Sequence, residues 1–162
     1  MATSKKESKS RAAVEYRIAR VSVKSFSEQL IELSEEQFKG FGFQIAFGAD
    51  LKEEASLISV GTKVQVQVDG AEDESKELIS MEVICSFRIK DIGVLKNDEG
   101  QVKVPRILFA NLIGISLSTA RGVLIGRSRY SELEEYPIPM LHPTKMVGDF
   151  AEAANISWIE AE

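Results

Sequence analysis

The sequence is poor in the residues that make covalent cross-links, metal centres and catalytic triads. Among 162 residues there is a single cysteine, Cys85, and a single histidine, His142. One cysteine cannot form a disulfide within the chain, and the two residues together exclude a metal site built from clustered Cys and His ligands. Cys85 lies in an alternating apolar segment, which favours a small core residue over a reactive thiol. His142 has no acid or nucleophile paired with it in the sequence, so it is a poor candidate for catalysis.

Motifs that hold metal ions or phosphates are also missing. The acidic run at 72–74 lacks the ligand spacing of a calcium loop. The glycines of segment 40–42 precede an alternating segment rather than a helix, so they do not form a phosphate cradle. We therefore expect no catalytic residue, no metal and no cofactor, and a protein that is not an enzyme.

The charge balance is acidic, with 20 Lys and Arg residues against 25 Asp and Glu residues and a net charge of −5. A nucleic-acid partner is therefore not expected. The Ser/Lys-rich segment 1–13 is predicted to be a disordered basic tail, and no apolar run follows it as in a signal peptide. We expect a cytoplasmic protein without membrane insertion. Residues 14–155 would form a single domain, and 156–162 an acidic C-terminal tail.

Four segments alternate between apolar and polar residues and are predicted to be strands: 14–23, 41–47, 58–68 and 81–89. In the first, the apolar parity switches after Ile18, which predicts a bulge near Ala19 and Arg20. The second has one heavily aromatic face, and segment 50–56 after it is polar and turn-like. Short polar connections favour an antiparallel meander, because parallel neighbours need long crossovers.

A long helix is predicted from Pro105 to about Tyr130. It is uncharged from Ile107 to Ala120 and apolar nearly all round, so it must be buried on two sides. The uncharged run is shorter than the roughly 20 residues that cross a bilayer. Small residues recur every four positions and predict an oligomer interface: Ala110, Gly114, Ser118, Gly122 and Gly126. We expect the helix to lie between its own sheet and a partner subunit, although burial in one larger monomer core stays open.

A proline-rich crossover follows the helix, and Thr144 is a predicted N-cap for a short C-terminal helix. The fold class is therefore α+β. Apolar side chains in the crossover and second helix are candidates for an apolar binding groove: Tyr136, Ile138, Met140, Leu141, Met146, Val147 and Phe150. Such residues either form an exposed binding surface or close the monomer core, and the sequence leaves both open.

Several segments resemble the SecB-type protein-export chaperones. They are Pro105-Arg106-Ile107-Leu108-Phe109, Arg121-Gly122, the crossover motif at 136–143, Phe150, and Glu82-Val83. The resemblance implies a four-stranded antiparallel sheet with two helices, assembled as a homotetramer (a dimer of dimers). It also implies binding of unfolded secretory precursors in apolar grooves without ATP, and delivery to the SecA motor. Glu82 matches an acid that the family uses against this motor.

The chain also departs from this family. Segment 110–113 reads Ala-Asn-Leu-Ile where the family has Pro-Tyr-Ala-Arg, and Val123 to Glu135 is an extra segment of about three helical turns. Ser25 stands where another acid is expected, and the C-terminal zinc-binding tail is missing. A SecB-like chaperone for another client, such as an antitoxin, is therefore an alternative. An oligomeric adaptor and a small-ligand-binding α+β domain, of the thioesterase-like kind, are two others.

Overall fold

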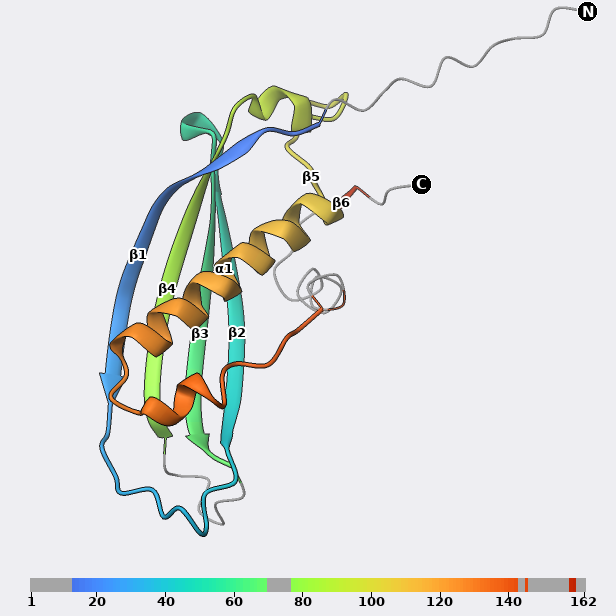
Figure 1. Cartoon of the computed structure of the whole chain (residues 1–162). Helices are drawn as coiled ribbons and strands as arrows, with labels where there is room; N and C mark the ends of the chain where they lie inside the picture. The colour runs from blue at the N-terminus through green and yellow to red at the C-terminus, as the bar shows by residue number, and fades with distance from the viewer. Residues whose placement is uncertain (1–12, 70–76, 143–144, 146–157, 160–162) are drawn as a thin grey trace, which may run out of the picture.

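Four long strands form one antiparallel sheet, and a 22-residue helix crosses one of its faces diagonally (Figure 1). The structure, a computed structural model, describes residues 13–69, 77–142, 145 and 158–159. The strands are β1 (Tyr16–Glu28), β2 (Phe41–Lys52), β3 (Leu57–Val68) and β4 (Glu77–Ile89), and the helix is α1 (Arg106–Arg127). The predicted four-stranded antiparallel sheet followed by a long helix is confirmed.

The order of the strands in the sheet is β1-β4-β3-β2. The predicted meander therefore holds for β2, β3 and β4, but it is wrong for β1, which pairs with β4 instead of β2. The segment 29–40 runs along the end of the sheet from β1 at one edge to β2 at the other (Figure 1). Alternation fixes the face that each residue takes, but it does not fix which strand lies beside which.

The predicted bulge in the first strand is confirmed. The pairing of β1 with β4 passes from Ile18 opposite Phe87 to Arg20 opposite Ser86, so Ala19 is the extra residue. A second shift, between Val23 and Ser25, was not predicted. Because of both shifts, five apolar residues of β1 lie on the helix side of the sheet: Tyr16, Ile18, Val21, Val23 and Phe26.

The core lies between α1 and the sheet face that it covers, which we call the inner face. From β3 the core takes Ile58, Val60, Val64 and Val66, and from β4 Ile79, Met81, Val83, Cys85, Phe87 and Ile89. The buried side of α1 consists of Leu108, Phe109, Ala110, Leu112, Ile113, Ser116, Leu117, Ala120 and Leu124. Each large aliphatic or aromatic side chain buried here contributes about 1.5–3 kcal/mol to folding before entropy is counted. Cys85 is fully buried, as predicted for a core residue.

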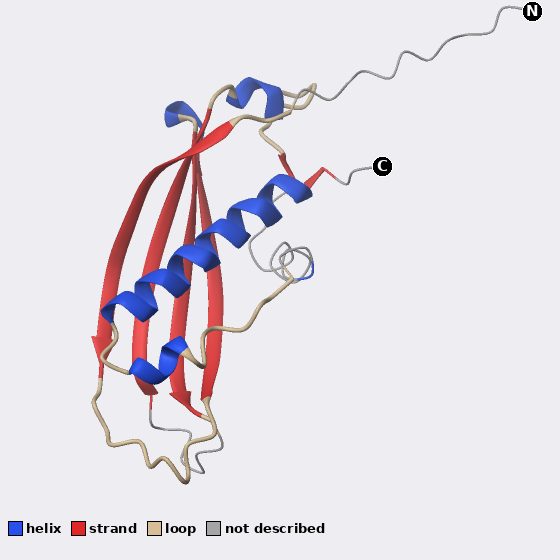
Figure 2. Cartoon of the chain, in the orientation of Figure 1, coloured by secondary structure: helices blue, strands red, loops and turns tan. Residues whose placement is uncertain are grey.

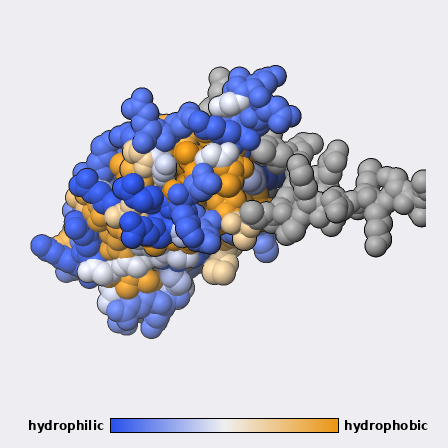
Figure 3. Space-filling model, turned by 90° about the horizontal axis from the view of Figure 1, so that it is seen from above, coloured by the Kyte–Doolittle hydropathy of each residue, from blue (hydrophilic) through white to orange (hydrophobic). Residues whose placement is uncertain are grey.

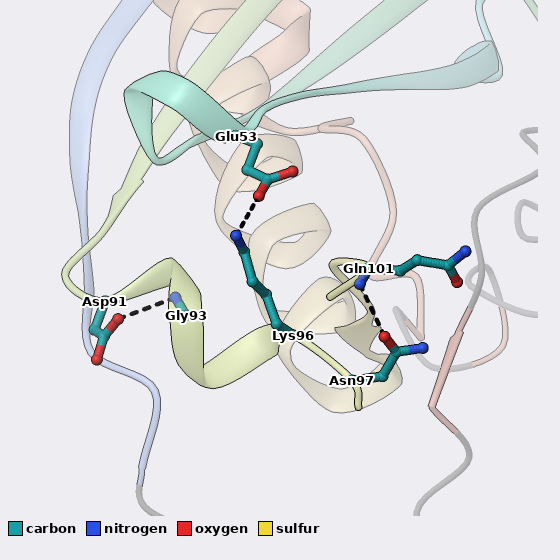
Figure 4. Close-up of polar contacts among 6 residues, drawn as sticks. All are labelled: Glu53, Asp91, Gly93, Lys96, Asn97 and Gln101. Carbon is teal, nitrogen blue, oxygen red and sulfur yellow. Dashed lines mark hydrogen bonds and ion pairs between the residues drawn. The ribbon is translucent and has the colours of Figure 1, made fainter. Parts of the chain in front are cut away.

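Two short 3₁₀ helices, η1 (Glu53–Ala55) and η2 (Ile92–Leu95), close the end of the sheet near the start of α1. Lys96 Nζ lies 2.6 Å from Glu53 Oε1, which joins the two connections (Figure 4). Asp91 accepts a hydrogen bond from Gly93 N at 3.0 Å, and Asn97 one from Gln101 N at 2.8 Å. Seen from above, apolar residues show in the middle of this end, with hydrophilic residues around them (Figure 3).

Several predicted boundaries are wrong. β1 continues past Val23 to Glu28, and β4 begins at Glu77 rather than at Met81. β2 continues to Lys52, so only 53–56 of the predicted turn 50–56 lies between strands. α1 begins one residue after Pro105 and ends at Arg127, and a third 3₁₀ helix, η3 (Ser131–Glu134), follows. The segment Val123 to Glu135 is therefore not three continuous helical turns. α1 and η3 lie on the same side of the sheet (Figure 2). Two residues before α1, β5 (Val104–Pro105), pair in parallel with β6 (Trp158–Ile159).

By length and composition α1 could cross a membrane, and it is the one such helix in the described part of the chain. Half of its most apolar 18-residue stretch is buried inside the protein. The covered side of the helix packs on the inner face of the sheet, which accounts for much of its apolar character.

Thr62, on the inner face of β3, is fully buried, and its hydroxyl has no hydrogen-bond partner among the described residues. Replacing Thr62 by Val substitutes a methyl group of similar size for the unpaired hydroxyl. We expect the free energy of unfolding, measured by urea denaturation, to rise by about 1–2 kcal/mol. The same change at Thr119, whose hydroxyl donates to Ile115 O at 2.9 Å, should give no gain. A loss of stability in T62V would mean that this hydroxyl is paired in the folded protein.

Candidate functional site

The crossover, residues 128–142, leaves the end of α1 and returns past β2 on the helix side of the sheet (Figure 1). Hydrogen bonds attach its first turn to the end of β1. The carboxylate of Glu28 accepts hydrogen bonds from the hydroxyl of Ser128 and from the backbone N–H of Arg129, the latter at 3.0 Å. The Tyr130 hydroxyl donates to Gln29 O at 2.5 Å and accepts from Ile31 N at 2.9 Å. The crossover therefore starts from a fixed position.

An aromatic cluster lies beneath the crossover at the β2 edge of the sheet. The ring of Phe38 lies 4.9 Å from that of Phe41 and 5.3 Å from that of Tyr136, both in edge-to-face geometry. Phe41 also meets Phe43 at 6.4 Å and Tyr130 at 6.1 Å. Edge-to-face pairs at these separations add about 0.5–1.5 kcal/mol each to the burial term. The cluster ties the segment before β2, the strand itself and the crossover together.

Gly40, between Phe38 and Phe41, has a backbone conformation that suits glycine. Its φ is +126°, and a Cβ atom there would lie 3.4 Å from Cδ1 of Tyr136. A side chain at this position would strain the backbone and crowd the Tyr136 ring. Glycine therefore lets the crossover pack directly on the segment before β2.

Arg121 of α1 holds the middle of the crossover. Its Nε donates to the carbonyl oxygen of Ile138 at 3.0 Å, and its Nη2 donates to the carbonyl oxygen of Pro139 at 2.6 Å. Hydrogen bonds from a charged donor are stronger than neutral ones. The proline-rich segment cannot offer a full set of N–H groups to a sheet, so these two bonds supply its attachment to the helix. The sequence placed Arg121 in a resemblance motif but did not predict its bonds to the crossover.

The predicted groove residues divide into three groups. Ile138 is 3% exposed and belongs to the core, and Leu141 is half-buried against it. Tyr136 is 42% exposed and Met140 is 87% exposed, so their apolar surface faces solvent. Met146, Val147 and Phe150, with the predicted C-terminal helix, lie outside the described residues. The predicted tails are likewise outside, apart from Ala13 and the backbone of 158–159.

The predicted ridge of small residues runs along one flank of α1 that becomes more exposed toward the C-terminal end of the helix. Ala110 is buried, Gly114 is half-buried, and Ser118, Gly122 and Gly126 are exposed. A Cβ atom added at Gly122 or Gly126 would meet nothing within 4 Å. Packing among the described residues therefore does not require glycine at these two positions.

A hollow of about 650 Å³ lies between this side of α1 and the start of β1, lined by Tyr16, Ala110, Asn111, Gly114, Ile115, Ser118 and Thr119. Ile18 and Val21, which β1 presents on the same side of the sheet, are 49% and 44% exposed. The helix thus leaves apolar surface uncovered beside it.

Glu82, the predicted motor contact, lies in β4 on the outer face of the sheet, opposite Ser25 of β1 and Lys63 of β3. It is half-buried and lies on the other side of the sheet from the crossover. Among the described residues no group of three or more His, Cys, Asp or Glu side chains comes together as a metal site.

No protein-family model matches the chain, and no curated protein matches it in sequence. Solved structures match the chain, and two of them, both with TM-scores below 0.5, are as follows. One is a SecB-like chaperone of Mycobacterium tuberculosis in complex with a peptide from an antitoxin, with 12% identity, a TM-score of 0.42, and coverage of 78% of this chain and 84% of that chain. The other is a protein of unknown function from Streptococcus agalactiae, with 16% identity and a TM-score of 0.28. The match covers 80% of this chain and 99% of that chain.

Replacing Arg121 by Met keeps the aliphatic part of the side chain and removes both donors to the crossover. We expect residues 136–142 to open more easily, by about 1–3 kcal/mol, which corresponds to roughly 5- to 150-fold faster amide exchange in that segment. Hydrogen exchange followed by mass spectrometry measures this directly. Arg127→Met, at the exposed end of α1, is the matched control and should leave the crossover unchanged. Equal exchange in R121M and the parent protein would contradict the role of these two bonds.

Proposed function

We propose that the protein is an ATP-independent chaperone that binds unfolded polypeptide segments on apolar surface at the crossover. One observation carries the proposal: Tyr136 and Met140 stay open to solvent, 42% and 87% exposed, although Arg121 and the aromatic cluster fix the segment that bears them. A fixed segment that keeps its apolar side chains outside the core presents a ready surface for another chain.

The physical basis of binding is burial of apolar side chains of the client. Each Å² removed from water contributes about 25 cal/mol, and part of this is lost to ordering of the client. Methionine suits such a surface because its flexible, polarisable side chain adapts to different partners. Binding and release then need neither nucleotide nor covalent chemistry. The proposal includes that the protein acts in the cytoplasm and is not an enzyme.

The most specific version of the proposal is that the clients are precursor proteins kept competent for export, with delivery to the SecA motor through Glu82. The resemblance at 105–109, 121–122 and 136–143 supports this version. A SecB-like chaperone dedicated to another client, such as an antitoxin, would use the same apolar surface. Binding assays with an unfolded export precursor and with an isolated antitoxin segment distinguish the two.

We further propose a homotetramer, a dimer of dimers, in which the ridge on α1 meets a partner subunit. The clear space at Gly122 and Gly126 supports this assignment, since no contact among the described residues requires glycine at either position. Several binding surfaces on one assembly raise the effective concentration for a long client, so weak subsites act together. In the alternative of an adaptor, assembly would cover the apolar surface and leave none for clients.

Chaperone activity is tested by light scattering from a chemically denatured client diluted into buffer without nucleotide. We expect a near-stoichiometric amount of the protein to suppress aggregation, and Met140→Glu to weaken suppression several-fold, because it places a charge on the binding surface. Val94→Glu is the control, since Val94 is 50% exposed in η2, at the other end of the sheet. If the parent protein leaves aggregation unchanged, the chaperone proposal fails.

The assembly is tested by the double variant Gly122→Leu/Gly126→Leu. Both changes fill open space and raise helix propensity, each by up to about 1 kcal/mol, so the subunit itself should not lose stability. We expect the mass measured by size-exclusion chromatography with light scattering to fall from tetramer to a smaller species. An unchanged mass, or a monomeric parent protein, would refute the interface.

A further inference from the structure

The outer face of the sheet, the face not covered by α1, carries a surplus of positive charge. Although the chain has a net charge of −5, the described strands present on this face six cationic side chains and three carboxylates, Asp50, Glu77 and Glu82. The strand register and the lining of two surface hollows place the cations there: Arg17, Arg20, Lys24, Lys52, Lys63 and Arg88. The acidic balance of the chain as a whole is therefore reversed on this face.

These cations have no carboxylate partner among the described residues. The ion pairs there are Lys90 with Glu15 and Lys96 with Glu53, and none of these four residues belongs to the six. The Glu15 carboxylate is committed to Lys90, whose pKa it raises through its hydrogen bond and charge. Within the described residues, therefore, no ion pair neutralises any of the six cations.

Two of the six cations lie directly opposite each other. Arg17 of β1 pairs with Arg88 of β4, and the single hydrogen bond of the Arg88 side chain goes, within the described chain, to the carbonyl oxygen of Ala55 at 3.3 Å. Like charges on directly opposed residues of neighbouring strands destabilise a sheet. A carboxylate from outside would relieve this repulsion, because guanidinium groups bind carboxylates with paired hydrogen bonds.

Two glycines on the outer face, Gly48 and Gly61, lie opposite each other in β2 and β3. Because neither has a side chain, the backbone of the sheet is accessible at this point. A Cβ atom at Gly48 would meet nothing within 4 Å, and at Gly61 the nearest atoms would be 3.9 Å away. Neither glycine has a positive φ. Glycine inside a strand costs about 0.5–1 kcal/mol relative to alanine, and it often marks close approach of another backbone. The pair forms part of the floor of a hollow of about 530 Å³, which Arg20, Lys24 and Lys52 also line.

We propose that the outer face binds an extended acidic segment of a partner polypeptide, with its backbone over the glycine pair and its carboxylates on the surrounding cations. Serine hydroxyls along the same face add neutral donors. They are the hydroxyl of Ser22 and one proton of the Ser59–Ser86 pair, whose oxygens lie 2.8 Å apart. A nucleic acid fits less well, because the strands present no aromatic side chain on this face for stacking bases.

This site is independent of the proposed chaperone activity, since it lies on the opposite side of the sheet from the crossover. The same charge surplus surrounds Glu82, which lies opposite Lys63 in the strand register. A motor that docks at Glu82 would accordingly have to present an acidic segment rather than a basic one. Charge complementarity of this kind governs association rate and specificity and weakens with salt.

The test uses fluorescence anisotropy with a labelled glutamate-rich peptide of about 12 residues, a length that follows one of these strands. We expect the peptide to bind the full-length protein, with affinity that falls steeply with added salt. The double variant Arg20→Glu/Lys24→Glu, which cancels the charge surplus, should weaken binding by about tenfold or more. Lys39→Glu/Arg127→Glu makes the same change in net charge away from the outer face and should bind nearly as well as the parent.

A second variant separates the site from general electrostatics. Gly48→Val adds a side chain where a Cβ atom meets nothing within 4 Å, and valine favours the strand. Thermal stability should therefore be kept or raised while peptide binding is lost. Equal weakening by both charge-reversal variants, or undiminished binding by G48V, would overturn the proposal. It is also overturned if the glutamate peptide does not bind, or if a length-matched oligonucleotide or anionic vesicles bind more tightly. Suppression of client aggregation by these variants reports separately on the chaperone proposal.

Discussion

Burial of one side of α1 on the inner face of the sheet is the interaction on which the rest of the structure depends. The helix supplies nine buried residues to the core, and β3 and β4 supply the opposing apolar rows. The same packing fixes Arg121, which holds the crossover, and it places the end of the helix where Glu28 can bind the turn at Ser128 and Arg129. Because the helix crosses diagonally, it leaves Ile18 and Val21 on β1 partly uncovered.

The crossover shows how a segment without regular secondary structure keeps a defined path. Its prolines remove N–H groups, so it cannot pair along β2 like a strand. Two charge-assisted bonds from Arg121, the Tyr130 hydroxyl bridge and the edge-to-face contacts of Phe38 take the place of a hydrogen-bonded ladder. Ile138 turns inward and completes the core, while Met140 stays outside. The segment is therefore both a core component and an apolar surface, which is the combination a peptide-binding site needs.

The two faces of the sheet differ because a strand presents alternate residues to opposite sides. The inner face is apolar and covered by the helix. The outer face carries small, polar and cationic side chains, and at Gly48 and Gly61 it has no side chain at all. A single sheet thus offers two surfaces of unlike chemistry, one continuing into the open apolar side of the helix and the crossover, and the other suited to charged partners. The spacing of residue types along each strand is sufficient to keep these surfaces apart.

The sequence by itself determined the features that depend on local periodicity: four strands, the bulge at Ala19, the long apolar helix, the burial of Cys85, and the small residues along one side of α1. Those features follow from side-chain period and backbone preference, which are properties of neighbouring residues. Only the tertiary structure decided that β1 pairs with β4, that Ile138 is buried while Met140 is exposed, and that Arg121 reaches the crossover carbonyls. It also decided that six cations scattered from Arg17 to Arg88 share one face. These outcomes depend on which distant segments meet, and alternation within a segment carries no information about its neighbours.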